Sequence, residues 1–328
     1  MTRWLTHIGK GLLTIGVLVI LLVTVDPRTL LASLERAKWP WMIAACTLLP
    51  VNLVLEGWVW NRLLTPTVGS VSLRDLATAV LCGFTLGFWT PVQVGEYAGR
   101  ALALPRGDRW TISLTVFAQR MVDMMVGVGF GLAGLSWALW TEVLPASLPW
   151  ILAATVGAGT MLLLLAFIVT PSRTHTVAER LFSGRRAITD RTKVFDRLSW
   201  SQIRPVVGGT ILRYVTFTGQ MVCLGLAFNA TASVGFLFLA VTLTFYVKYL
   251  LPSLTFLDLG IREGSAAFFF QVVGLGAATG VNAALVLFAV NLFLPAVLGV
   301  PFLSRLTLGQ RTSDPIDARS EPSVVARS

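Results

Sequence analysis

The stretch Phe88-Trp-Thr-Pro-Val-Gln-Val-Gly-Glu-Tyr-Ala-Gly-Arg100 decides how this chain folds. It ends an apolar run and interrupts it with Pro91 and Gly95, after which Glu96 and Arg100 follow four residues apart. Proline removes a helical hydrogen bond and bends the chain, and glycine permits a close approach or a positive φ. The exposed start of the next helix attracts anions. The stretch therefore predicts a broken helix with a charged, anion-binding start, or else a helix cap with a surface ion pair.

The composition is that of a membrane protein. Of the 328 residues, 55% are hydrophobic and 13% are charged, and the mean hydropathy is +0.75. A soluble domain carries about 25% charged residues, so we expect an all-α polytopic membrane protein. The net charge of +10 comes from basic residues in short loops between apolar runs, where they mark the cytoplasmic side and attract anionic lipid. The expected partners are therefore membrane lipids, and nucleic acid is not expected.

The apolar runs predict about eight transmembrane helices. The run Gly11–Val25 follows basic residues and lacks a cleavage site, so it predicts an uncleaved first helix and a cytoplasmic N-terminus. Trp39–Trp60 predicts the second span, with tryptophans at both ends as interfacial belts and Glu56 in the last turn near one interface. The other spans are expected at Thr111–Trp140, Val143–Ser172, Val206–Phe228 and Ala232–Leu250, and Gly264–Ser304 should form two helices with a turn near Gly280.

The run Leu76–Gly95 is long enough to be another span, but the distribution of charge argues that it does not cross. If it crossed, the loop 171–204 would lie outside the cell, and that loop carries eight basic residues against three acidic ones. Such a loop belongs in the cytoplasm. We therefore predict that Leu76–Gly95 is a re-entrant or broken segment, which is tolerated only where protein buries it or where it lines a wet cavity.

A second stretch, Leu251-Pro-Ser-Leu-Thr-Phe-Leu-Asp-Leu-Gly-Ile-Arg-Glu-Gly264, repeats this arrangement. Pro252 again ends an apolar run, and Gly260, Arg262 and Glu263 follow it. Interrupted helices at matching places in two halves of a chain indicate the binding site of a transporter. The sequence therefore predicts an internal repeat.

The repeat and the charge distribution together define the expected domain organisation. We predict one transmembrane domain over residues 1–304, with half-repeats of about 39–170 and 205–304 joined by the basic cytoplasmic loop 171–204. The polar tail 305–328 is expected to be disordered. Its four arginines indicate a cytoplasmic C-terminus.

Charged residues inside the other spans are further site candidates. Arg120 and Asp123 stand three residues apart on one helix and can pair, either to pack the bundle or as part of a site. Arg213 and Lys248 have no local acidic partner. They either snorkel to an interface or pair with a ligand anion or with one of Glu96, Asp258 and Glu263.

All four tyrosines stand next to these charged positions: Tyr97, Tyr214, Tyr246 and Tyr249. Tyrosine is common at membrane interfaces, so an interfacial belt is one interpretation. The other interpretation is that their hydroxyls line a hydrated path for a lipid headgroup.

Motifs of other function classes are missing or lack their structural context. Gly129-Phe-Gly-Leu-Ala-Gly134 has the spacing of a dinucleotide site, but it lies inside an apolar helix, so helix packing through small residues is predicted instead. No Walker A sequence, Asp-x-Asp or histidine cluster occurs, and the three cysteines lie far apart within apolar runs. We therefore expect no cofactor, no bound metal and no enzymatic activity.

The pattern Pro91-x-x-x-Gly-Glu-x-x-x-Arg100, with Leu251-Pro and Leu-Gly-Ile-Arg-Glu-Gly264 further on, resembles the transmembrane flippase domain of lysylphosphatidylglycerol synthases. The resemblance covers about residues 10–305. Trp89-Thr90 departs from the Asn-x-Leu-type lead-in that is frequent in that family, and no room remains after Ser304 for the cytosolic aminoacyl-transferase domain. The resemblance implies lipid translocation in the plasma membrane without lysyl-lipid synthesis.

We therefore expect a flippase or facilitator for an anionic phospholipid, an aminoacyl-phospholipid or a polyprenyl-phosphate-linked lipid. Its headgroup would enter a cleft lined by basic residues, while acidic residues hold these in place and the acyl tails stay in the bilayer. The candidate path residues are Pro91, Gly95, Glu96, Arg100, Arg120, Asp123, Arg213, Lys248, Pro252, Gly260, Arg262 and Glu263. The alternatives are a membrane-embedded transferase acting on a lipid-linked substrate and a non-catalytic partner of a separately encoded lipid-modifying enzyme.

Overall fold

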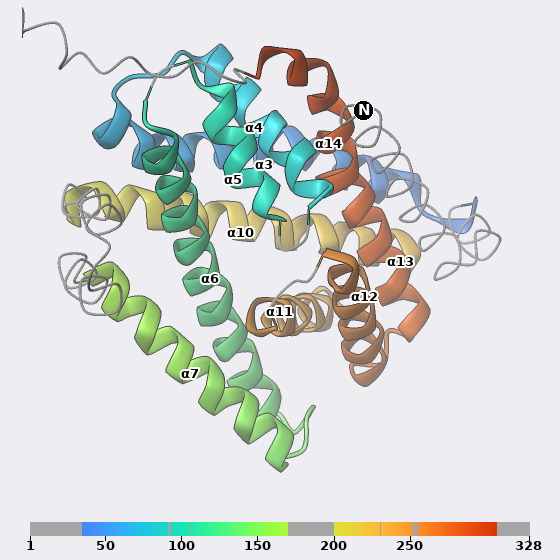
Figure 1. Cartoon of the computed structure of the whole chain (residues 1–328). Coiled ribbons are helices and arrows are strands. Elements are labelled where there is room, and N and C mark those ends of the chain that lie inside the picture. The colour runs from blue at the N-terminus through green and yellow to red at the C-terminus, as the bar shows by residue number, and fades with distance from the viewer. Residues whose placement is uncertain are drawn as a thin grey trace, which may run out of the picture.

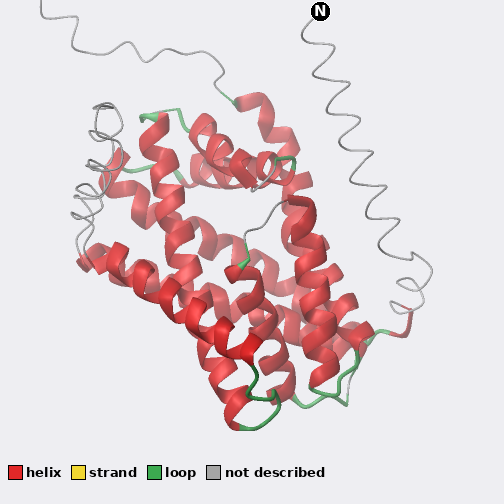
Figure 2. Cartoon of the chain, turned by 60° about the horizontal axis from the view of Figure 1, so that its bottom comes forward, coloured by secondary structure: helices red, strands yellow, loops and turns green. Residues whose placement is uncertain are grey.

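The computed structural model describes residues 35–90, 93–105, 107–169, 200–229, 231–251 and 255–306, and within these ranges every regular element is a helix (Figures 1 and 2). In this part of the chain five segments are long and apolar enough to cross a membrane: Trp39–Val68, Arg109–Trp140, Leu148–Ala166, Ser201–Phe228 and Ala277–Ser304. The predicted class of an all-α polytopic membrane protein is confirmed. The predicted first span, nearly all of the basic loop and nearly all of the tail lie outside the described residues.

Helix α10 (Trp200–Phe228) is the element around which the others are arranged. It crosses the middle of the molecule in Figure 1 and contacts α3 (Trp39–Val68), α6 (Arg109–Trp140), α11 (Val234–Leu250) and α13 (Ala277–Phe288). Helix α7 (Leu148–Val169) packs against α6, and α12 (Thr255–Val272) packs against α11 and α13. Four helices that contact α10 thus come from both halves of the chain.

Helix α3 does not end at Trp60, where the second span was predicted to end, but continues to Val68. Its thirty residues give a length of about 45 Å, which exceeds the hydrocarbon core. Trp60 is therefore not an interfacial anchor: it is fully buried, and its indole N–H donates a hydrogen bond to the hydroxyl of Thr115 at 3.0 Å. As a result Glu56 lies in the interior of the bundle, not near an interface.

The run that begins at Leu76 is broken, as predicted, into α4 (Leu73–Phe88) and α5 (Val94–Ala103). The two helices pack antiparallel because glycines of α5 lie directly on backbone carbonyls of α4. A Cβ at Gly95 would collide with the carbonyl of Leu86, and one at Gly99 would lie 2.5 Å from the carbonyl oxygen of Cys82. The chain therefore turns back on itself near Phe88 and brings the start of α5 beside α4.

Glycines of α6 provide the surface on which α11 packs. The ring of Tyr246 lies against Gly131, and the side chain of Thr242 lies against Gly134. One turn before Gly131, Gly127 faces the ring of Tyr249 in the same way. The prediction that the glycine motif of this helix serves helix packing is confirmed.

The C-terminal helices differ from the sequence prediction in the position of their turn. The turn predicted near Gly280 lies instead between α12 and α13, where Gly274 and Gly276 have φ of 80° and 84°. Gly280 is inside α13, and a side chain there would collide with the carbonyl of Ala266 on α12. Gly280, which was predicted to lie at the turn, therefore permits the close packing of α13 on α12.

After α13 the chain continues through a π-helical turn (Ala289–Phe293), α14 (Leu294–Gly299) and a 3-10 turn (Val300–Arg305). Helix α14 packs on α4, and the hydroxyl of Thr85 donates a hydrogen bond to the carbonyl of Ala296 at 2.8 Å. Within the π turn, Asn291 accepts a hydrogen bond from the Asn52 amide at 2.9 Å. The C-terminal helices thus hold the α4–α5 hairpin in place against α3.

Candidate functional site

Six charged side chains from four helices meet in one ion-pair network. Three are arginines and three are carboxylates, so their formal charges cancel. The members are Glu56 on α3, Glu96 and Arg100 on α5, Arg120 and Asp123 on α6, and Arg213 on α10.

Arg100 lies at the closed end of the network and is fully buried. Its guanidinium pairs with both Glu56 and Glu96 and donates a hydrogen bond to the Gln119 side-chain oxygen at 3.0 Å. It also lies 4.9 Å from the ring centroid of Trp60, which covers one of its faces. Two carboxylates, an amide and an aromatic ring surround Arg100, so its guanidinium is enclosed. We infer that Arg100 positions Glu56 and Glu96.

Arg120 and Arg213 lie at the open end of the network. Arg120 binds Glu96 at 2.5 Å and its helical neighbour Asp123 at 3.2 Å, so the pair predicted from the spacing of three residues is confirmed. Arg213 binds Asp123 at 2.9 Å and Glu56 at 2.5 Å. Every carboxylate is therefore shared between at least two arginines, which offsets the cost of burying charge inside a membrane protein.

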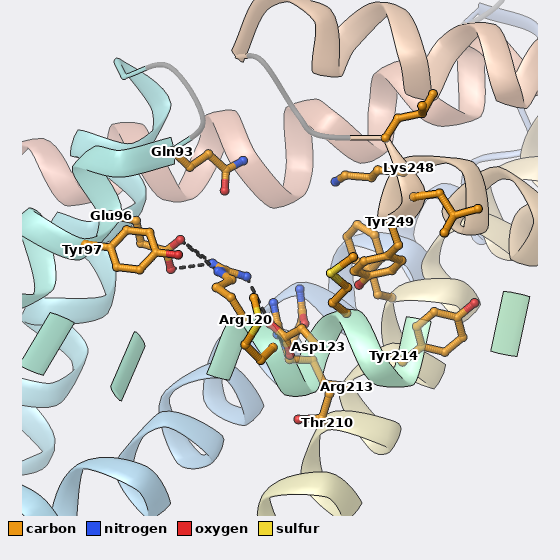
Figure 3. Close-up of a pocket in the computed structure, with 16 residues that line it drawn as sticks. Gln93, Glu96, Tyr97, Arg120, Asp123, Thr210, Arg213, Tyr214, Lys248 and Tyr249 are labelled. Atoms are coloured by element: carbon orange, nitrogen blue, oxygen red, sulfur yellow. Dashed lines mark hydrogen bonds and ion pairs between the residues drawn. The ribbon is translucent and has the colours of Figure 1, made fainter. Parts of the chain in front are cut away.

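A cavity of about 520 Å³ lies in front of this open end. Figure 3 shows Gln93, which directly precedes α5, with Glu96 and Tyr97 of α5 on one side of it and Lys248 and Tyr249 of α11 on the other. The remaining labelled side chains come from α6 and α10. Arg120, Asp123, Thr210 and Arg213 lie between these two sides, and Tyr214 lies beyond Tyr249. The volume is in the range of small-molecule binding sites.

The walls of the cavity present positive charge although the network itself is neutral. The side chain of Arg120 is 27% exposed and that of Arg213 is 18% exposed, whereas the three carboxylates are between 1% and 7% exposed. Lys248 also lines the cavity. An entering group therefore meets guanidinium and ammonium groups first, which favours an anion.

Helix α10 offers two further donors at the cavity. Thr210 lines it, and within the described structure its hydroxyl has no hydrogen-bond partner. The Nε–H of Arg213 is likewise buried without a partner among the described residues. A buried donor without a partner costs about 1–3 kcal/mol, so a ligand with acceptor oxygens would be stabilised here.

The structure brings together most of the residues that the first stretch and the charged spans predicted. Glu96, Arg120, Asp123, Arg213 and Lys248 all line the cavity. Arg100 pairs with Glu96 behind it, and Gly95 forms the contact between α5 and α4. Pro91, Pro252 and Asp258 lie outside the residues whose side chains the structure describes.

The second stretch is placed elsewhere. Arg262 is buried in α12, where it binds the adjacent Glu263 at 2.5 Å and lies 5.2 Å from the ring centroid of Phe288. Gly260 is exposed at the start of the described side chains of α12. Within the described part of the chain, Gly260, Arg262 and Glu263 do not line the cavity. The partners predicted for Arg213 also differ, because it pairs with Asp123 and Glu56.

Sequence reasoning missed Glu56, which is a member of the network, and Gln119, which bonds both Arg100 and Glu56. Glu56 accepts hydrogen bonds from Arg100 and, at 3.0 Å, from the Gln119 amide, and it forms an ion pair with Arg213. The signal was present, because a carboxylate within an apolar run is by default a functional candidate. It was discounted because Trp58 and Trp60 were taken to mark the membrane interface.

Three of the four tyrosines line the cavity: Tyr97, Tyr214 and Tyr249. This agrees with the interpretation that tyrosines border a polar path. Tyr246 has a packing role, since its hydroxyl donates a hydrogen bond to the carbonyl of Ala153 on α7 at 2.7 Å.

Comparison with known proteins gives one match. The family model of the lysylphosphatidylglycerol synthase TM region matches residues 8–299, which include all six members of the ion-pair network. No curated protein matched the chain. No solved structure matched it either.

Proposed function

We propose a function from two findings: the chain belongs to the lysylphosphatidylglycerol synthase TM region family, and its helices enclose a cavity that presents cationic groups. The family and the apolar helices establish a multi-pass membrane domain related to lipid synthases or flippases. The proposal is that this domain passes the headgroup of an anionic lipid across the plasma membrane. The lipid would be an anionic phospholipid, an aminoacyl-phospholipid or a polyprenyl-phosphate-linked lipid.

The observation that supports this most strongly is the difference in exposure within the ion-pair network. The side chains of Arg120 and Arg213 are partly exposed to the cavity, while the carboxylates that hold them are nearly buried, although Glu96 and Asp123 also border it. A guanidinium has five N–H donors, so each arginine can keep its carboxylates and still offer donors to phosphate oxygens. The carboxylates fix the arginines in place before the lipid arrives, which reduces the ordering cost of binding.

The division of the lipid between protein and bilayer follows from solvation. An ionised group at the centre of a bilayer costs several kcal/mol even on the lower scales. Acyl tails gain nothing from leaving the hydrocarbon, because the surrounding lipid is equally apolar. Only the headgroup therefore needs a protein path, and the cavity at Arg120 would be part of that path.

The test is the rate at which fluorescent lipids cross liposomes that contain the purified protein, measured by dithionite quenching. The variant is Arg120→Gln, because each of its partners keeps another arginine: Glu96 keeps Arg100, and Asp123 keeps Arg213. Loss of one charged hydrogen-bonding group should slow an anionic lipid by about tenfold or more. The matched control is Arg74→Gln, an exposed arginine in the first turn of α4.

Equal rates for the wild type and Arg120→Gln would contradict the proposal, provided that the two proteins are equally folded. A rate that falls equally for anionic and zwitterionic lipids would contradict the role of charge. We propose further that the lipid leaves the cavity chemically unchanged. A covalently modified lipid found by mass spectrometry after incubation would instead support the transferase alternative.

A further inference from the structure

A second hollow lies on the outer side of the contact between α3 and α10. It has a volume of about 480 Å³ and its walls are almost entirely apolar. Val54, Leu55 and Trp58 of α3 form one wall, and Pro205, Gly208 and Leu212 of α10 form the other. The side chains of Val54 and Leu212 are 70% and 54% exposed. We call this hollow the α3–α10 groove.

The groove is separate from the central cavity because the two use different faces of α10. Gly208 and Leu212 face the groove, whereas Thr210 and Arg213 face the cavity. The groove extends from Pro205 to Leu212, which corresponds to about 10 Å along a helix. That is two thirds of one leaflet of hydrocarbon, about 15 Å. The groove is therefore long enough to hold part of one extended acyl chain.

Two arginines lie at the same end of the groove. Helices α3 and α10 run antiparallel, because Lys38 bonds Ala227 near one end while Trp58 packs on Gly209 near the other. Arg62 stands one turn beyond Trp58 on α3, and Arg204 directly precedes Pro205 on α10. Both side chains are exposed.

The surroundings of these arginines leave their charge available. The guanidinium of Arg62 lies over the ring of Trp58, 4.9 Å from its centroid, so the same residue that walls the groove also holds the arginine beside it. Among the described residues, neither Arg62 nor Arg204 is paired with a carboxylate. An apolar groove thus ends at two cations, and this pattern matches one molecule with a tail and an anionic head.

We propose that the α3–α10 groove binds an anionic phospholipid, with one acyl chain between the helices and the phosphate at Arg62 and Arg204. The acyl chain gains no free energy from burial in the groove, because the surrounding bilayer is equally apolar; it contributes only a fit of shape. Selectivity therefore comes from the headgroup, and a basic residue near a membrane surface contributes about a fivefold preference for anionic lipid. The two arginines together should give roughly a 25-fold preference.

The test is competitive lipid binding to the full-length protein in detergent, with phosphatidylglycerol and phosphatidylcholine as probes and bound lipid counted by native mass spectrometry. Two variants address the two parts of the site. Arg62→Gln with Arg204→Gln removes the charges. Gly208→Leu fills the groove without straining the fold, because a Cβ at Gly208 meets no atom within 4 Å. The matched control is Gly159→Leu, an exposed glycine of α7 with equally open surroundings.

The proposal predicts that both groove variants lose one bound phosphatidylglycerol, while Gly159→Leu keeps it. The same comparison in an Arg120→Gln background, which weakens the central cavity, should again show one lipid fewer for each groove variant, so this experiment does not depend on the function proposed for the central cavity. Retention of this lipid by the double arginine variant would overturn the proposal. The proposal would also be overturned if the double arginine variant lost the lipid while Gly208→Leu kept it. Diffuse charge attraction would then explain the binding without the groove.

Discussion

Replacing Glu56 by glutamine should strongly destabilise the protein. Glu56 is 1% exposed, accepts hydrogen bonds from Arg100 and Gln119 and forms an ion pair with Arg213. Glutamine therefore leaves the buried Arg100 and the half-buried Arg213 with one carboxylate fewer. Removing one partner of a buried ion pair costs about 3–5 kcal/mol. Total stabilities of about 5–15 kcal/mol are usual, so the loss would be easy to detect.

The assay is unfolding of the purified protein in mixed micelles by increasing SDS, followed by circular dichroism. Glu142→Gln is the matched control, since Glu142 is exposed in the turn between α6 and α7, and surface changes stay within about 0.5 kcal/mol. The double variant Glu56→Gln with Arg100→Gln restores neutrality and should recover about 1–3 kcal/mol relative to additive losses. A loss below about 1 kcal/mol for Glu56→Gln, or strictly additive losses in the double variant, would refute the shared network.

Three further changes separate packing from transport. Gly95→Ala forces a Cβ against the carbonyl of Leu86, so we expect about 1–3 kcal/mol of destabilisation in the same SDS assay; wild-type stability would contradict the close packing of α5 on α4. Tyr246→Phe removes the hydrogen bond to Ala153 and should cost about 1 kcal/mol while lipid transport in liposomes stays unchanged; slower transport would place Tyr246 in the path. Thr210→Val removes a buried hydroxyl without a partner among the described residues, so we expect unchanged or higher stability but transport slower by about two- to tenfold; faster transport would contradict its role as a donor.

The features that the sequence predicted correctly depend on neighbouring residues. The break before α5 follows from a proline and a glycine within one apolar run. The ion pair between Arg120 and Asp123 follows from helical spacing, and the close contact at Gly131 follows from its small size. The break and the ion pair have their cause within a few residues, and the contact at Gly131 has its cause in the glycine itself, although its partner Tyr246 is distant.

The features that could not be predicted depend on distant parts of the chain. Arg213 pairs with Asp123 across ninety positions of sequence, and no local pattern specifies that contact. Glu56 was assigned to an interface because tryptophans usually anchor helices there. Trp60 is instead used inside the bundle, where it covers Arg100 and bonds Thr115. Only the packing of α3 against α5 and α6 reveals that role.

The central claim is that the headgroup of an anionic lipid occupies the cavity between α5, α6, α10 and α11. Photo-crosslinking tests it most directly, with a phosphatidylglycerol analogue whose reactive group is on the headgroup and a second analogue whose reactive group is at the end of an acyl chain. We predict that the headgroup probe labels peptides that carry Gln93, Tyr97, Thr210 or Tyr249, that excess phosphatidylglycerol suppresses this labelling, and that Arg120→Gln reduces it. Headgroup labelling confined to the outer faces of the helices, or cavity labelling by the acyl-chain probe alone, would contradict the claim.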